Sequence, residues 1–165
     1  MKISLFSSRF QVRKLTEADL EQVLALYQTN PLYFEHFPPL PSLESLANDR
    51  VDCPPGKSLS DKYFLGFWEH NRLVAILDLI DGYPTVEIAY MGLFMVDANL
   101  SGQGLGSMIM AELLPQLATR FKKFRLGYVE SNPQSSHFWA KLGFFPTGEV
   151  KELAGRRIVL SEYYL

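Results

Sequence analysis

VDANLSGQGLG, residues 96–106, follows a long apolar run and opens a second run whose apolar residues recur at helical spacing. Its three glycines, Gly102, Gly104 and Gly106, stand at alternate positions. Glycine permits positive φ and lets a ligand approach the backbone closely. At the start of a helix, unpaired N–H groups and the helix dipole favour an anion. The stretch therefore predicts a strand, a tight turn and a helix that together bind a phosphate or pyrophosphate.

The composition is that of a folded protein with no marked affinity for polyanions or lipid. The 165 residues are 47% hydrophobic and 21% charged, which fits one domain spanning residues 1–165. The net charge of −2 lacks the basic excess of nucleic-acid binders and of membrane-surface proteins. No apolar run is long enough to span a membrane, and residues 1–10 lack a signal-peptide pattern. The cytoplasm is the expected location.

Cysteine and histidine give no sign of a metal site. The lone cysteine, Cys53, excludes an internal disulfide and a multi-cysteine site. We interpret it as a bystander thiol rather than a nucleophile, because no histidine lies near it in sequence. His36, His70 and His137 do not have metal-ligand spacing, so no metal is expected.

Apolar periodicity and turn residues predict the element order β-α-α-β-β-β-α-β-α-β-β. Strands are expected at residues 11–15, 62–69, 73–80, 85–96, 124–130, 144–150 and 158–164. Helices are expected after Thr16, which is placed as an N-cap, and at 42–51, 104–120 and 133–142. Pro115 predicts a kink or break in the third of these helices. The order indicates a mixed sheet with helices on it rather than a doubly wound fold.

Two segments resemble motifs of the GNAT superfamily of N-acetyltransferases, which use acetyl-CoA. A strand ending at Val96 and followed by Gly104-Leu105-Gly106 is similar to the end of the family's Arg/Gln-x-x-Gly-x-Gly/Ala signature. The family's second pattern is an Asn, a small residue, an aromatic residue and Leu-Gly-Phe. It is matched here by Asn132, Ser135, Trp139 and residues 142–144.

The resemblance implies an α/β (α+β) fold with a twisted, mostly antiparallel sheet of six to seven strands. That sheet would be splayed at a central parallel pair and carry about four helices on its faces. The implied activity is transfer of an acetyl group from acetyl-CoA to a primary amine of a small molecule or peptide. The amine would attack directly in a ternary complex, with no covalent enzyme intermediate.

A non-catalytic acyl-CoA-binding or regulatory domain on the same fold stays open as the alternative, because two positions depart from the family. Ser101 stands where the signature has Arg or Gln. Trp139 stands where many relatives have a tyrosine that protonates the departing thiolate, and an indole is no useful acid.

The resemblance also implies a set of cofactor contacts. The pantetheine arm would lie along Phe94, Met95 and Val96, and the phosphates on Ser101, Gly102, Gln103, Gly104, Leu105, Gly106 and Ser107. Asn132 would reach the arm or the phosphates, Ser135 would also bind the cofactor, and Trp139 would pack on the acetyl end. The simpler interpretations are a ligand-free turn for the glycines, a helix cap for Asn132 and core packing for Trp139.

For catalysis, the resemblance favours Glu87 as general base, because relatives often carry a carboxylate on this strand. An apolar strand would raise its pKa toward neutrality, whereas a solvent-facing glutamate would have no such role. Tyr90, and after it Tyr128 and His137, are further acid–base candidates.

The acceptor site is expected between residues 27–46 and 153–164. Tyr33, Phe34, Glu35 and Phe37 in the first segment suit a cationic amine with an apolar body. An edge strand at residues 158–164 would allow a homodimer.

The basic residues at 120–125 either bind the 3′-phosphate of CoA or neutralise a helix C-terminus. Two other nucleotide sites are excluded. The glycines are not spaced as Gly-x-Gly-x-x-Gly, and no Lys-Ser/Thr follows them.

Overall fold

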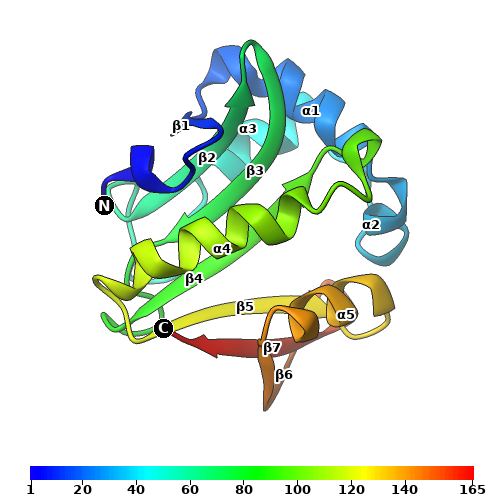
Figure 1. Cartoon of the computed structure of the whole chain (residues 1–165). Helices are drawn as coiled ribbons and strands as arrows, with labels where there is room; N and C mark the ends of the chain where they lie inside the picture. The colour runs from blue at the N-terminus through cyan, green and yellow to red at the C-terminus, as the bar shows by residue number, and fades with distance from the viewer.

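The computed structural model describes residues 1–165 and is built around one seven-stranded sheet (Figure 1). The strand order is β1-β2-β3-β4-β5-β7-β6, and every neighbouring pair is antiparallel except β4 and β5. The strands are β1 (Gln11–Lys14), β2 (Lys62–Glu69), β3 (Arg72–Ile80), β4 (Ile88–Val96), β5 (Lys123–Val129), β6 (Phe145–Leu153) and β7 (Arg156–Tyr164). The fold prediction of a mostly antiparallel sheet with one central parallel pair is confirmed.

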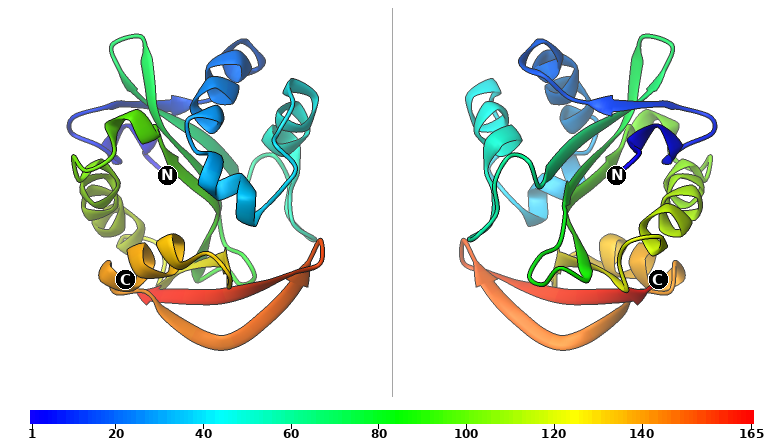
Figure 2. Two further views of the ribbon diagram at one scale, coloured as in Figure 1. Left: turned by 90° about the vertical axis from the view of Figure 1, so that its right-hand side faces the viewer. Right: turned by 90° about the vertical axis from the view of Figure 1, so that its left-hand side faces the viewer.

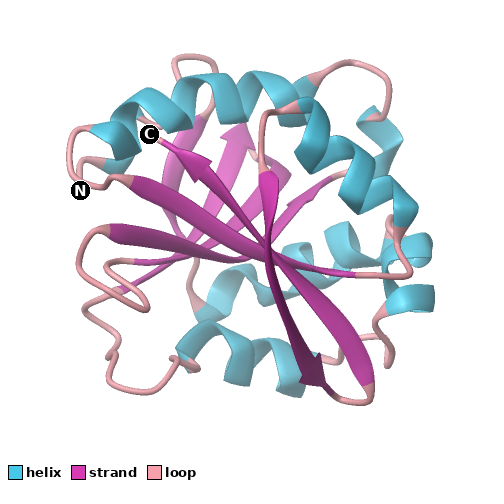
Figure 3. Ribbon diagram, turned by 90° about the horizontal axis from the view of Figure 1, so that it is seen from below, coloured by secondary structure: helices cyan, strands magenta, loops and turns pink.

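Helices cover both faces of this sheet (Figure 3). They are α1 (Leu20–Gln28), α2 (Pro31–His36), α3 (Leu43–Val51), α4 (Leu105–Ala118) and α5 (Pro133–Lys141). The side chains of α1, α2 and α3 share one buried cluster, and those of α4 and α5 share the other. Figure 2 shows α4 on one side of the sheet and α1 with α3 on the other. No helix is both long and apolar enough to cross a membrane.

The first helix begins where the sequence predicts. Thr16 and Asp19 form a reciprocal capping box, and a single 3₁₀ turn leads into α1. The Asp19 carboxylate also accepts hydrogen bonds of 2.9 and 2.7 Å from the Arg13 guanidinium. The hydrogen bonding by Arg13, and to a smaller extent that by Thr16, holds the pKa of Asp19 well below its usual value.

An Asp19→Ala variant is expected to lose about 2 kcal/mol of unfolding free energy at pH 7, because it removes charged hydrogen bonds. A carboxyl group whose pKa is lowered by folding stabilises the protein above its unfolded pKa of about 3.9 and less at lower pH. Urea unfolding should therefore show a penalty that shrinks below that pH. The exposed Glu21→Ala on the same helix should cost less than about 0.5 kcal/mol. A penalty for Asp19→Ala that is constant down to pH 2 would contradict this account.

Besides shifts of one to three residues at other boundaries and the additional helix α2, two features differ from the sequence prediction. β4 begins at Ile88 rather than at residue 85, because residues 85–87 form an exposed turn. α4 runs unbroken through Pro115 to Ala118, so of the predicted kink or break, the break does not occur. Buried Leu113 and Leu117 on either side of the proline hold the helix against the sheet.

The last two strands form a tight hairpin instead of being joined by a seven-residue link. Ala154 and Gly155, both at positive φ, make the two-residue turn between β6 and β7. β7 pairs with β5 on one side and β6 on the other. The edge strand is therefore β6, and the prediction that residues 158–164 form an edge is wrong.

The parallel pair separates halfway along its length. β4 and β5 are paired only from Ile88 with Lys123 to Met91 with Leu126. Beyond Met91 the two strands diverge, as the right-hand half of Figure 1 shows. The backbone of residues 92–96 therefore has no neighbour on the β5 side.

A β-bulge marks the point of separation. Asp78 of β3 faces Leu93, whereas the next β3 residue, Leu79, faces Met91, so Gly92 is the extra residue. The bulge reverses which β4 side chains face α4: Met91 does so before it and Phe94 after it. The alternation of β4 side chains between the two faces of the sheet is therefore interrupted at Gly92.

Candidate functional site

The glycine-rich turn lies beside the diverging ends of β4 and β5. Gly102 and Gly104 have φ of +80° and +71°, and Gly104 is the left-handed N-cap residue of α4. A Cβ built on either would meet no atom within 4 Å. No side chain caps the N-terminus of α4. The turn thus presents exposed backbone and unpaired N–H groups, the arrangement that binds phosphate.

Gly106 has a different role, because it lets two helices approach. A Cβ there would lie 3.1 Å from the Phe138 ring of α5. That ring stacks on Phe94 of β4 at 6.4 Å. The third glycine therefore packs α4 against α5 at the site, while Leu105 is buried core. Ser101 and Gln103 are exposed, and Ser107 is half-buried.

The free edge of β4 offers backbone groups at alternate residues. Asp97 N–H donates to the Val74 carbonyl of β3 at 2.9 Å, and backbone direction alternates along a strand. Met95 therefore also directs its backbone toward β3, while Phe94 and Val96 direct theirs into the gap. Of the three residues expected to pair with a pantetheine arm, Met95 is not placed to do so.

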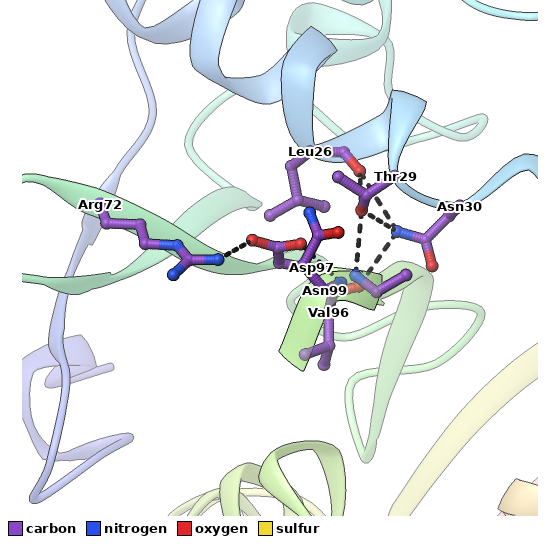
Figure 4. Close-up of polar contacts among 8 residues, drawn as sticks. Leu26, Thr29, Asn30, Arg72, Val96, Asp97 and Asn99 are labelled. Carbon is purple, nitrogen blue, oxygen red and sulfur yellow. Dashed lines mark hydrogen bonds and ion pairs between the residues drawn. The ribbon is translucent and has the colours of Figure 1, made fainter. Parts of the chain in front are cut away.

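A hydrogen-bond network joins α1 to the start of the glycine turn (Figure 4). Asn30 Nδ2 donates to the Val96 carbonyl at 3.0 Å, and the Ala98 N–H donates to Thr29 Oγ1 at 3.0 Å. Buried Asp97 accepts from Arg72 at 2.6 Å. This network, which was not predicted from the sequence, fixes the turn relative to the opposite face of the sheet.

The α5 helix supplies the aromatic wall of the site. Asn132 is buried and caps this helix through a 3.1 Å hydrogen bond from the Ser135 N–H. Trp139 is buried among Phe94, Phe138 and Phe144, with ring centroids 4.8–6.1 Å apart. Asn132 as a cap and Trp139 as a core residue therefore both match their simpler interpretations.

A cavity of about 430 Å³ lies between α5 and the C-terminal strands, and Trp139 is one of its lining residues. Tyr128, His137, Phe144 and Ser161 also line it. The structure thus brings Tyr128, His137 and Trp139 to one wall. Tyr90 lies elsewhere, on the opposite face of the sheet, where burial raises its pKa and its ring meets Tyr83 edge-on.

The expectation that Glu87 sits on an apolar strand is wrong. Glu87 lies in the exposed turn before β4, and its side chain, 55% exposed, pairs with Lys122. Val96 is nine residues further along the chain, so roughly 30 Å of extended chain separates the two, at about 3.3 Å per residue. Glu87 is therefore at the end of β4 remote from the glycine turn.

The basic residues after α4 are also ion-paired. Arg120 pairs with Asp81, Lys122 with Glu87, and both Lys123 and Arg125 with Glu162. Asp81 and Glu87 lie in the turns next to β3 and β4, and Glu162 lies in β7, so carboxylates of the chain itself neutralise these basic residues. This favours the interpretation of a structural charge cluster over a phosphate site.

A carboxylate that the sequence analysis missed lies at the point where β4 leaves β5. Asp78 of β3 points to the α1–α3 face, and its Oδ2 accepts from Lys62 Nζ at 2.9 Å. Its Oδ1 is buried and has no partner. Burial, partly offset by Lys62, raises the pKa of Asp78. The available signal was a single Asp in the apolar run LVAILDLI, residues 73–80.

The two segments expected to form the acceptor site are brought together. His36 at the end of α2 contacts Ser131 after β5, with 3.1 Å between Nδ1 and Oγ. Arg156 of β7 lies over the Phe37 ring at 5.8 Å. Tyr33 and Phe34 pack edge-on at 5.0 Å, while Glu35 is exposed.

These features define a class: an α/β domain whose central parallel pair opens beside an uncapped, glycine-started helix. The sequence model of the family described as Acetyltransferase (GNAT) family matches residues 20–144. The chain therefore belongs to the GNAT family of acetyltransferases. Family membership supports an acyltransferase with acyl-CoA as cosubstrate.

Several solved structures share the fold at low sequence identity. An acetyltransferase from Thermus thermophilus has a TM-score of 0.75 at 21% identity, over 94% of this chain and 97% of that one. The Salmonella typhimurium enzyme that modifies the N-terminal serine of ribosomal protein L7/L12 has 0.74 at 15%, over 97% of each chain. The PaiA N-acetyltransferase of Thermoplasma acidophilum, in complex with coenzyme A, has 0.64 at 18%, over 93% and 99%. No curated protein matches the chain in sequence.

Proposed function

We propose that this protein transfers an acetyl group from acetyl-CoA to a primary amine of a small molecule or peptide. The observation that carries the proposal is the open glycine turn at the N-terminus of α4, next to the unpaired edge of β4. A ligand with an anionic group and an extended, amide-bearing arm would bind the turn through the anion and the strand edge through the arm. Coenzyme A has a pyrophosphate and such an arm, and the family uses it.

Each part of the cosubstrate has residues that fit it. Backbone N–H groups from Gly102 to Ser107 would hold the pyrophosphate, because the Cβ positions of Gly102 and Gly104 are open. The backbone of Phe94 and the N–H of Val96 face the gap in which the arm would pair. Trp139 would close the acetyl end as a packed wall.

The chemistry requires a neutral amine, a polarised thioester carbonyl and a stabilised leaving thiolate. In the proposed reaction the amine attacks the carbonyl carbon directly, so the C–N bond forms as the C–S bond breaks. Trp139 cannot protonate the thiolate. The second proton of the attacking nitrogen or a solvent proton does so instead.

Incubating the protein with acetyl-CoA and a panel of primary amines, and following release of the free thiol, tests the proposal. Amine-dependent thiol release, with the acetyl group recovered on the amine, is the expected result. Tight binding of acetyl-CoA with no turnover on any panel member would instead favour a non-catalytic acyl-CoA-binding domain. That alternative stays open because Trp139 stands where many relatives have a proton-donating tyrosine.

A further inference from the structure

We infer that Asp78 binds the acceptor amine and accepts its proton, and that Lys62 is the positioning residue that orients the carboxylate; the inference rests on the proposed transfer to an amine. Asp78 faces Leu93, the second β4 residue beyond the last parallel pair. It therefore lies at the apex of the opening, on the face opposite the glycine turn's helix. An acceptor entering from the α1–α3 side would meet it there.

The two carboxylate oxygens of Asp78 are not equivalent. Oδ2 is held by Lys62, whose side chain is only 4% exposed. Oδ1 is buried and unpartnered. Buried polar atoms in folded proteins are nearly always hydrogen-bonded. The side chain of Asp78 is still 17% exposed, and that exposed surface is not at Oδ1. A charged amine, which donates up to three hydrogen bonds, would therefore meet the carboxylate on its Oδ2 side.

A glycine lies against the Oδ2 side of the Asp78 carboxylate. Gly92 is exposed although it lies in the middle of a central strand. A Cβ on Gly92 would lie 2.9 Å from Asp78 Oδ2. Any side chain at this position would therefore crowd Oδ2, and the exposed glycine at the bulge avoids that crowding.

The charges around Asp78 select the kind of acceptor. The ionisable groups that face it are Lys62 of β2, Tyr27 of α1, Tyr90 of β4, and Asp49 and Asp52 at the end of α3. The three carboxylates of Asp78, Asp49 and Asp52 thus outnumber the single ammonium group of Lys62, which leaves the site net negative. The site suits a primary amine that carries no carboxylate next to the reacting nitrogen.

The proton transfer balances within the proposed reaction. The acceptor enters as an ammonium ion, and one N–H bond breaks as the Asp78 carboxylate gains the proton. The freed electron pair attacks the thioester carbonyl, and the thiolate leaves. The second N–H proton of the attacking nitrogen ends on the thiol, and Asp78 returns its proton to water. Burial raises the pKa of Asp78, which makes the carboxylate a stronger base.

Steady-state kinetics of Asp78→Asn, together with calorimetric binding of coenzyme A, test the inference. The variant is expected to lose about a hundredfold or more in kcat, the usual contribution of a general base, with an unchanged Kd for coenzyme A. The matched control is Asp81→Asn, which removes a similarly buried, ion-paired carboxylate just after β3 whose partner is Arg120. Asp81 follows Ile80, which faces Tyr90 in the paired half of β4, so this variant should keep both constants within about twofold.

Variants of Lys62 and Gly92 add readouts that a merely structural role would not move. Lys62→Met removes the positive charge that lowers the pKa of Asp78, so the acid limb of the pH–kcat/KM profile should move to higher pH, and Lys62→Arg should restore it. Gly92→Ala should raise KM for the amine and spare the affinity for coenzyme A. The wild type should prefer 2-phenylethylamine to phenylalanine by about tenfold or more, because like charges repel.

Wild-type turnover with an undiminished Asp78→Asn would overturn the role of Asp78 and leave the proposed function standing. Loss of coenzyme A binding in Asp78→Asn would also count against it, because the residue would then support the fold or the cofactor. No amine turnover by the wild type would refute the proposed function, and the inference with it.

Discussion

Gly104→Glu is expected to weaken coenzyme A binding by about a hundredfold or more, which is about 2.7 kcal/mol. Gly104 has a φ of +71° and opens α4 with no side chain over its free N–H groups. The glutamate would place a carboxylate where the phosphates are expected and would strain the left-handed backbone by about 1–2 kcal/mol. Isothermal titration with coenzyme A measures the effect directly.

Gly148→Glu is the matched control for this change. Gly148 of β6 also has positive φ, at +88°, and a Cβ there meets nothing within 4 Å. It lies at the far edge of the sheet from the glycine turn, so the variant should bind coenzyme A as the wild type does. Ser101→Arg should bind equally or more tightly. A loss of affinity in Ser101→Arg would mean that the turn holds its phosphates differently.

Phe124→Ala is expected to cost about 3–5 kcal/mol of unfolding free energy, the range for truncating a buried phenylalanine. Phe124 is fully buried and pairs with Ala89 in the short parallel contact between β4 and β5. Its ring packs on Phe144, 5.8 Å away. It therefore holds the two halves of the sheet together just before they diverge.

Urea unfolding of Phe124→Ala beside Phe145→Ala separates this role from the general loss of an aromatic ring. Phe145 is 39% exposed on the edge strand β6 and stacks only on Tyr164. Its truncation should cost less than about 1 kcal/mol. Equal penalties for the two variants would show that the parallel contact is not where the sheet halves are joined.

The glycine turn and the caps could be predicted from the sequence because they are local. Positive φ at Gly102 and Gly104 is a requirement of the residue itself, and Thr16, Asn132 and Gly143 mark helix ends through contacts within a few residues. Apolar spacing then gave nearly every strand and helix. These signals depend on short stretches of chain and not on the rest of the fold.

The place of Asp78 could not be predicted in the same way, because it depends on pairing between distant strands. Glu87 and Asp78 both precede the glycine turn in sequence. Glu87 lies in the turn before β4 begins at Ile88, whereas Asp78 lies within β3 beside the bulge at Gly92. The bulge arises from the register between β3 and β4. A lone Asp in an apolar strand was the one local sign of Asp78.

Coenzyme A is expected to lie on the glycine turn and along the unpaired half of β4. Backbone amide chemical shifts, recorded with and without coenzyme A, test it most directly. The largest changes are expected at residues 102–107 and at Phe94 and Val96, with small changes at residues 148–155 of the hairpin. Shifts centred on the α5 cavity of Tyr128, His137 and Ser161, with the glycine turn unmoved, would contradict the claim.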